Sequence, residues 1–193
     1  MPSRTSRHDA THDRIVEVAA RTLRRNGYAG VGVADVMKQA GLTHGGFYAH
    51  FASRDALLAE AIDRAGRVTA ATMGDRVEAS RSRGESALRT LVEHYLSEAH
   101  LAGIESGCVV AALGSEMHRQ SEELRGPAVE EVRKLIALVQ RALPPGGNRK
   151  QVMVIADTLV GSLQLARAFG ANAQGKAMLS ASRDALLAQY DKT

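Results

Sequence analysis

A short stretch from Gly41 to Phe51 combines hydroxyl, imidazole and aromatic side chains with three glycines, in the order Gly-Leu-Thr-His-Gly-Gly-Phe-Tyr-Ala-His-Phe. Hydroxyl and imidazole groups can bond phosphate oxygens and base edges, and glycine lets a backbone approach a ligand closely. Phe47 and Phe51 are four residues apart, the spacing that places both on one face of a helix. We therefore expect the two phenylalanines to anchor a short helix whose other face stays exposed to solvent.

The charge of the chain is concentrated around this stretch. Residues 1–54 contain eight Lys and Arg against four Asp and Glu, whereas the other 139 residues contain 17 of each sign. The formal net charge of +4 for all 193 residues therefore comes from the first segment. A basic segment on a neutral body is the electrostatic footprint of a nucleic-acid-binding protein.

Helical periodicity predicts the elements that position this stretch. One apolar face is formed by Ile15, Val18, Ala19, Thr22 and Leu23, and a second by Val33, Val36, Met37 and Ala40. Gly41 closes the second helix, because a tight turn between helices needs a positive φ that glycine adopts cheaply. The pattern is that of a helix-turn-helix unit, in which the start of the second helix reaches base edges and its flanks hold phosphates.

The remainder of the chain also follows the helical period. Ser53 is a good N-cap, and glycine, proline and polar residues separate the apolar segments. The predicted helices cover residues 53–73, 84–103, 107–119, 127–143, 148–170 and 173–190. With the three preceding helices the count is nine, which predicts an all-α fold.

The segment 148–170 is apolar around most of its circumference. Such a helix must be buried on nearly all faces, and a small chain rarely encloses a helix fully. A partner subunit covering one side is the favoured interpretation, and a central core helix of a monomer is the alternative. No apolar run reaches about 18 residues and no secretory signal is visible, so we expect a cytoplasmic protein without a membrane span.

Cys108 is the single cysteine, so the sequence predicts neither a disulfide nor a zinc site, and we expect no metal or cofactor. It follows Gly107 at a predicted helix start, where the helix dipole favours a thiolate. It is either a reactive thiol or a small buried side chain. A third hypothesis is an enzyme that uses Cys108 as nucleophile and His94, His100 or His118 as base. No phosphate-binding loop or hydrolase motif in the sequence supports it.

The order and spacing of several motifs closely resemble the DNA-binding domain of TetR-family regulators over roughly residues 12–60. The motifs are Gly27-Tyr28 to Asp35-Val36, then Gly41-Leu42-Thr43-His44-Gly45-Gly46-Phe47-Tyr48-Ala49-His50-Phe51, then Ser53-Arg54-Asp55-Ala56-Leu57-Leu58. The resemblance implies a homodimer with an N-terminal DNA-binding domain over 1–54, ordered from about residue 10. It also implies a ligand-binding and dimerisation domain over 55–193, with the last two helices at the dimer interface.

The same resemblance assigns roles to individual residues. It implies phosphate contacts for Thr43, Tyr48 and His50, base-facing positions for His44, Gly45 and Gly46, and a backbone contact for Arg54. The sequence departs from the family pattern at Gly32, where a Ser or Thr often opens the second helix. A hydroxyl contact with DNA is therefore lost at this position, whereas a backbone N–H contact can remain.

The implied function is repression at a palindromic operator on double-stranded DNA, relieved by a small hydrophobic effector. The alternative within the family is a sensor of electrophiles or redox state acting through Cys108. The effector pocket should lie between the helices of residues 84–170. The candidate pocket residues are Leu91, His94, Tyr95, Cys108, Ala112, Met117, Leu138, Leu159, Leu163 and Phe169.

Overall fold

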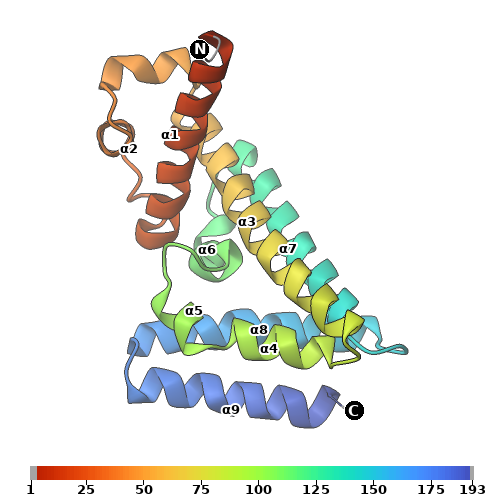
Figure 1. Cartoon of the computed structure of the whole chain (residues 1–193). Coiled ribbons are helices and arrows are strands. Elements are labelled where there is room, and N and C mark those ends of the chain that lie inside the picture. Colours follow the sequence, from red (N-terminus) through yellow and green to blue (C-terminus); the bar gives the residue numbers. More distant parts are fainter. Residues whose placement is uncertain (1–3, 192–193) are drawn as a thin grey trace.

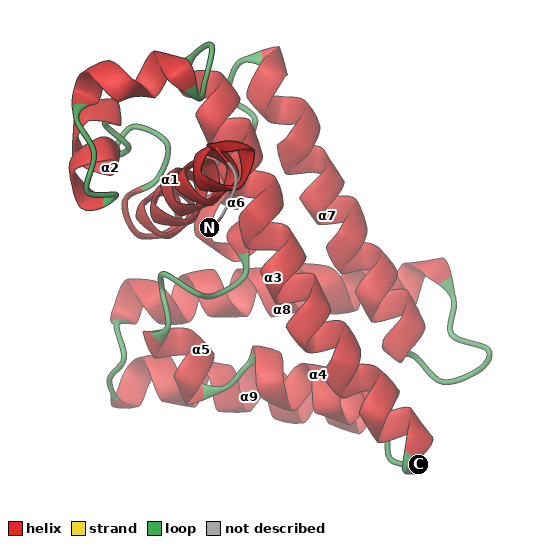
Figure 2. Cartoon of the chain, turned by 45° about the horizontal axis from the view of Figure 1, so that its top comes forward, coloured by secondary structure: helices red, strands yellow, loops and turns green. Residues whose placement is uncertain are grey.

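The computed structural model of the chain describes residues 4–191, and in this part every regular element is a helix (Figure 2). The all-α prediction is confirmed. The first residues of the predicted domain 1–54 and the last two of 55–193 lie outside the described part. The elements are α1 (Arg4–Asn26), α2 (Val33–Gln39), the 3-10 helix η1 (His44–Ala49), α3 (Arg54–Ser82), α4 (Ala87–Tyr95), α5 (Glu98–Ala102), α6 (Val109–Met117), α7 (Glu122–Ala142), α8 (Arg149–Phe169) and α9 (Ala173–Tyr190).

The N-terminal unit packs α1, α2 and η1 around one apolar centre. The predicted face of α1 is confirmed, since Ile15, Ala19 and Leu23 are fully buried. Helix α1 begins at Arg4, six residues before the position from which order was expected. Its first turns are held by contacts that the periodicity did not show: the His8 ring stacks on His50, which follows η1.

Helix α3 is longer than the predicted segment 53–73 and runs diagonally through the molecule, from the N-terminal unit to the end at which α4 begins (Figure 1). Ser53 is its N-cap, as predicted, and its hydroxyl accepts a hydrogen bond from the Ala56 N–H at 2.9 Å. The extension past residue 73 follows from the burial of Val77 and Ser80, and the helix stops before Gly84, whose φ is +73°. A boundary between residues 54 and 55 falls in its first turn, so the division into two domains stays a prediction.

Two other predicted boundaries are wrong. The segment 84–103 is not one helix but two, α4 and α5, because Ser97 starts a new helix by accepting a hydrogen bond from the His100 N–H at 3.1 Å. Pro127 does not begin a helix but lies inside α7, which starts at Glu122. The backbone hydrogen bond that proline removes falls near the start of α7, among exposed residues, where its cost is small.

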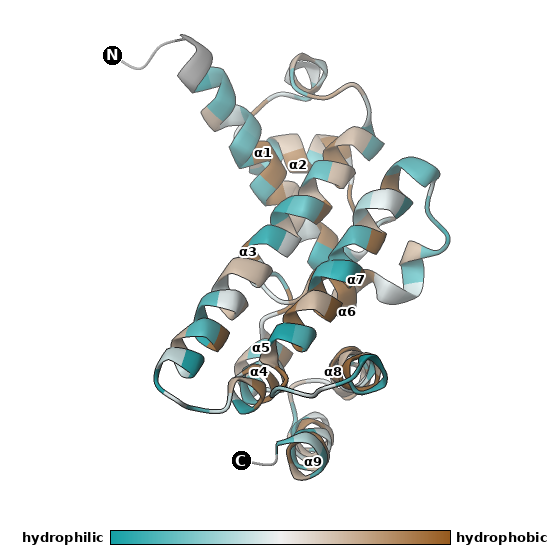
Figure 3. Ribbon diagram, turned by 90° about the vertical axis from the view of Figure 1, so that its right-hand side faces the viewer, coloured by the Kyte–Doolittle hydropathy of each residue, from teal (hydrophilic) through white to brown (hydrophobic). Residues whose placement is uncertain are grey.

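Helices α8 and α9 lie side by side at one end of the molecule and are seen end-on in Figure 3. A capping box between Asn148 and Gln151 fixes the start of α8. One face of α8 is buried, but Val154, Leu165 and Phe169 are exposed, so this chain alone does not cover the helix on all sides. By length and composition α8 would also be apolar enough to cross a membrane, a property that it shares with core helices of other folds.

Candidate functional site

The turn between α2 and η1 has the geometry that the sequence predicts. Gly41 has a φ of +72°, and the Leu42 N–H bonds back to the Met37 carbonyl at 2.9 Å, which closes the end of α2. The following segment, however, is a six-residue 3-10 helix rather than an α-helix. Gly45 and Gly46 explain this difference, since glycine is among the poorest α-helix formers.

Both phenylalanines anchor η1 as expected. Phe47 and Phe51 are buried, and their ring centroids are 5.6 Å apart. The residues between and before them point outward: Thr43, His44 and Gly45 are exposed, and Tyr48 is 73% exposed. The structure therefore presents a polar surface on a fixed apolar base, which is the arrangement that a DNA-contacting segment needs.

The two glycines of η1 are not required by packing inside this chain. A Cβ added at Gly45 would meet nothing within 4 Å, and one at Gly46 would meet the Met37 side chain at an ordinary 3.6 Å. Both positions therefore leave open space beside the backbone, and a contact with base edges there stays a prediction.

His50 is partly buried in a histidine cluster that the sequence analysis missed. Its ring centroid lies 4.3 Å from that of His8 and 5.9 Å from that of His12. Burial, reinforced by these two neighbours, lowers the pKa of His50. His12 also bonds Glu60 of α3 at 2.7 Å. The four-residue spacing of His8 and His12 was the available signal, because it places both rings on one face of α1.

Arg54 is engaged within the chain. Its side chain donates to the Val31 carbonyl at 3.0 Å and to the Tyr28 carbonyl, so it fastens α3 to the loop before α2. These bonds hold the helix-turn-helix unit in place. A contact between Arg54 and the DNA backbone stays a prediction beside this positioning role.

A cavity of about 390 Å³, counted to its open mouth, lies between α3, α4, α6 and α7; we call it the α3–α7 cavity. Its free interior space is about 30 Å³, room for a water molecule but not for a larger ligand. It is lined by Gly66, Thr69, Ala70, Met73, Tyr95, Cys108, Val109, Val110, Glu131, Lys134, Leu135 and Leu138. A second depression, of about 630 Å³ with its mouth, shares Thr69 and Met73 with it and extends to His94, His100 and Gly107.

The predicted pocket residues separate into three groups. Tyr95, Cys108 and Leu138 line the α3–α7 cavity, and His94 lines the second depression. The others line neither: Leu91, Leu159, Leu163, Met117 and Ala112 belong to the core or its edge, and Phe169 is half exposed at the end of α8. The prediction of these six residues rested on their apolar character, which core residues and pocket residues share.

Glu131 and Lys134 are the cavity residues that the sequence analysis missed. Glu131 is 4% exposed, and its Oε1 accepts a hydrogen bond from the Lys134 Nζ at 2.7 Å. Burial raises the pKa of Glu131, and the bond to Glu131 raises the pKa of Lys134. The signal was present in the periodicity, because Glu131 stands where an apolar residue is expected between Ala128 and Leu135.

Cys108 is the N-cap residue of α6 and is 5% exposed. Its backbone N–H donates to His100 Nε2 at 3.0 Å, while His100 Nδ1 bonds the Tyr95 carbonyl at 2.7 Å. Both bonds require the neutral Nδ1–H tautomer, and burial lowers the pKa of His100 to about 4. The imidazole lone pair is thus used by a backbone N–H, which leaves His100 no role as a base for the thiol.

Helix α6 joins the cavity to the N-terminal unit. Its first residues line the α3–α7 cavity, and at its other end Glu116 accepts a hydrogen bond from the Tyr28 N–H at 3.2 Å. The Glu116 carboxylate lies against Gly27, where an added Cβ would be 2.5 Å from Oε1. In the described part of the chain no group of three or more His, Cys, Asp or Glu residues is placed to hold a metal.

Residues 15–61 match the family model described as bacterial regulatory proteins, tetR family. The Mycobacterium tuberculosis protein "Uncharacterized HTH-type transcriptional regulator Rv0196" is 25% identical over 80% of this chain and 83% of its own length. The Escherichia coli "HTH-type transcriptional repressor NemR" is 24% identical over 88% of this chain and 85% of its own length.

Solved structures share the fold. The reduced form of Escherichia coli NemR superposes with a TM-score of 0.76 at 18% identity, over 93% of this chain and 97% of that one. A TetR transcriptional regulator from Chloroflexus aurantiacus superposes with a TM-score of 0.78 at 21% identity, over 97% of this chain and 98% of that one. These relatives are transcriptional regulators and not enzymes, which argues against the cysteine-dependent enzyme. The helix-turn-helix unit, residues 15–61, thus matches the TetR family of bacterial regulatory proteins, and the chain as a whole shares the fold of a solved TetR regulator.

Proposed function

We propose that the protein is a cytoplasmic, homodimeric repressor that binds a palindromic operator through residues 1–54 and is released from it by a small apolar effector bound within residues 55–193. The observation that carries this proposal is the outward presentation of Thr43, His44 and Tyr48 on the buried Phe47 and Phe51. The printed name of its relative NemR, a transcriptional repressor, supports repression as the outcome.

The DNA contacts divide into two kinds. Thr43, Tyr48 and His50 bond phosphates, whereas His44 and the backbone of Gly45 and Gly46 face the bases. The exposure of Tyr48 and the absence of packing demands on the two glycines within the described chain support this division. Two such segments in a dimer would enter successive major grooves about 34–36 Å apart.

The dimer forms through α8 and α9. Val154, Leu165 and Phe169 are large apolar side chains that α8 leaves exposed along much of its length. A second copy of the same face would bury them in an isologous interface, as a twofold dimer requires. This completes the burial that the apolar circumference of α8 predicts.

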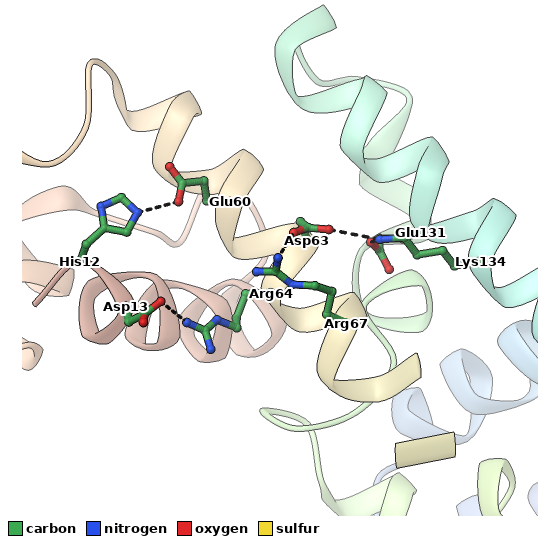
Figure 4. Close-up of polar contacts among 8 residues, drawn as sticks. All are labelled: His12, Asp13, Glu60, Asp63, Arg64, Arg67, Glu131 and Lys134. Carbon is green, nitrogen blue, oxygen red and sulfur yellow. Dashed lines mark hydrogen bonds and ion pairs between the residues drawn. The ribbon is translucent and has the colours of Figure 1, made fainter. Parts of the chain in front are cut away.

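The effector acts by opening the α3–α7 cavity. Its free space is too small for a larger molecule, so binding must displace α3, α6 or α7. Both α3 and α6 contact the DNA-binding unit: α3 through the His12–Glu60 and Asp13–Arg64 pairs (Figure 4), and α6 through Glu116. A ligand that shifts these helices changes the separation of the two recognition segments, and the coupling is reciprocal.

The test is a selection of duplex sequences bound by the full-length protein, followed by affinity measurements on the selected duplex over a range of salt. We expect a palindrome, one dimer per site, and an affinity that falls steeply as salt rises. A monomer in solution, or equal binding to every duplex, would contradict the proposal.

A thiol sensor remains the second candidate because Cys108 lines the α3–α7 cavity beside the Tyr95 hydroxyl, with Arg24 and Arg167 close enough to interact with it electrostatically. Here the thiolate would add to an electrophile that enters the cavity. A Cys108→Ser variant that still leaves DNA on treatment with a quinone or aldehyde would exclude this candidate. Retained DNA binding by that variant, with release of the unaltered protein, would favour it.

A further inference from the structure

The α3–α7 cavity contains a carboxylate that the apolar character of its other walls does not explain. Glu131 is 4% exposed and lies against Gly66 of α3, so closely that a Cβ added at Gly66 would be 1.6 Å from Oε2. A glycine at position 66 is therefore what allows the carboxylate to occupy this position. Burying a carboxylate costs free energy unless its hydrogen bonds are replaced.

Within the described chain, the hydrogen bonds that the Glu131 carboxylate loses on burial are only partly replaced. Lys134 bonds Oε1 of Glu131 at 2.7 Å, whereas Oε2 receives no hydrogen bond from any residue in the described range. Lys134 is also shared, because its Nζ lies 3.1 Å from Oδ1 of Asp63 (Figure 4). Asp63 has a second partner, since its Oδ2 lies 3.1 Å from Nη1 of Arg67, whereas Oε2 of Glu131 keeps an open acceptor.

The rest of the cavity wall offers no competing charge. Apart from Glu131 and Lys134, its residues are neutral, and most are apolar: Ala70, Met73, Val109, Val110, Leu135 and Leu138 are among them. An apolar ligand with a cationic hydrogen-bond donor would satisfy the open oxygen. An anionic ligand of the same shape would place a second negative charge beside a carboxylate that Lys134 alone neutralises.

We propose that Glu131 is the recognition group of the effector cavity and selects apolar molecules that carry a protonated amine. This inference rests on the proposed effector response and adds the chemical class of the effector. The amine donates to Oε2 of Glu131, and the apolar body packs between α3, α6 and α7. Gly66 is the positioning residue that leaves room for the carboxylate.

Three probes of one shape test the charge preference: phenylbutylamine, phenylbutanol and phenylbutyrate, titrated into the full-length dimer by calorimetry. A hydrogen bond to a buried charged group predicts that the amine binds roughly tenfold tighter than the alcohol. Phenylbutyrate should bind most weakly. Equal affinities for amine and alcohol, tighter binding of the acid, or no binding of any probe would overturn the proposal.

The variant Glu131→Gln keeps the shape of the side chain and removes its charge, so it should lose the preference for the amine while phenylbutanol binds within about twofold of the unaltered protein. Glu130→Gln is the matched control, because Glu130 is exposed on the same helix and pairs with Arg133 at 3.3 Å. Glu131→Asp, which keeps the charge, should retain part of the preference. A preference that survives in Glu131→Gln would also overturn the proposal.

Operator binding measured on the same samples without probe separates this proposal from the function on which it rests. If the operator is bound and the alcohol releases it as well as the amine, effector response stands and the role of Glu131 fails. If no operator is bound, the proposed function itself fails, whatever the order of probe affinities.

Discussion

The two functional regions of this chain are assembled in different ways. The proposed DNA-contacting segment is local: Thr43, His44 and Tyr48 lie within six residues, and a glycine turn with two buried phenylalanines fixes them. The α3–α7 cavity is distributed, because its walls come from residues 66–73, Tyr95, residues 108–110 and residues 131–138. Four helices must pack correctly before the cavity exists.

This difference has a mechanical consequence. The recognition segment is carried on a closely packed base and can move as a unit, whereas the cavity is bounded by helices whose packing leaves little free space. In the proposed mechanism, a ligand deforms the second region and the first transmits the displacement to DNA. The following predictions distinguish the two regions by their expected effects on stability and on DNA binding, from the largest effect to the smallest.

Phe47→Ala should have the largest effect, because it removes a fully buried ring from beneath η1. We expect a loss of about 3–5 kcal/mol in the free energy of unfolding and no measurable operator binding. Chemical denaturation and fluorescence anisotropy with labelled DNA measure both.

Leu135→Ala is the companion variant in the cavity wall, where Leu135 is buried. It should cost about 2–3 kcal/mol of stability but leave operator affinity within about threefold, since the recognition segment is untouched. Loss of DNA binding in a folded Leu135→Ala protein would show that the two regions are not separable.

The next largest effect is expected from acid, which should lower the free energy of unfolding through His100. His100 is neutral in the folded protein, with its pKa lowered from 6.5 to about 4, so the unfolded chain binds a proton between these pH values and the folded chain does not. Stability therefore falls as the pH falls from 6.5 towards 4, by up to about 3 kcal/mol. Thermal unfolding of the unaltered protein and of His100→Gln across this range measures the difference.

The glutamine variant can accept from the Cys108 N–H and donate to the Tyr95 carbonyl, but it does not titrate. Its stability should depend less on pH than that of the unaltered protein. His118, which is exposed, provides the control variant His118→Gln. Equal pH profiles for all three proteins would contradict the role assigned to the His100 hydrogen bonds.

The segment from Gly41 to Phe51 could largely be predicted from sequence, whereas most of the α3–α7 cavity could not. The turn at Gly41 and the burial of Phe47 and Phe51 follow from spacing over eleven residues. The 3-10 form of η1 was missed, although Gly45 and Gly46 gave a reason for it. The early start of α1 also escaped prediction, since it depends on a ring of His50 that lies far along the chain.

In the cavity region, periodicity identifies which residues are apolar but not which of them enclose empty space. The predicted pocket residues Tyr95, Cys108 and Leu138 line the α3–α7 cavity, whereas Leu159 and Leu163 have the same apolar character and lie in the core. Glu131 was the more informative residue, because an acid on an apolar face needs a physical reason. Glu131 can occupy this position because it packs closely against Gly66, a contact that only the packed structure reveals.

Tyr48→Ala should change DNA binding alone. The side chain is 73% exposed, so its loss should leave stability within about 0.5 kcal/mol and weaken operator binding about tenfold through a lost phosphate bond. Since phosphates carry no sequence information, the loss should be similar for operator and unrelated duplexes. His44→Ala is the contrasting variant, which should reduce the preference for one base while changing nonspecific binding little. The reverse pattern would exchange the roles of the two residues.

The smallest effect concerns the ion pair that joins the two regions along α3. Asp13 of α1 pairs with Arg64, and Asp13 is 69% exposed, so Asp13→Asn should cost no more than about 0.5 kcal/mol of stability. If α3 transmits the effector signal through this pair, however, the variant should lose part of its effector response while keeping its operator affinity without effector. Glu105→Gln, which removes the Arg25–Glu105 pair of similar exposure away from α3, is the control. An unchanged effector response in Asp13→Asn, measured as operator affinity with and without saturating ligand, would leave Glu116 and α6 as the connection between cavity and DNA.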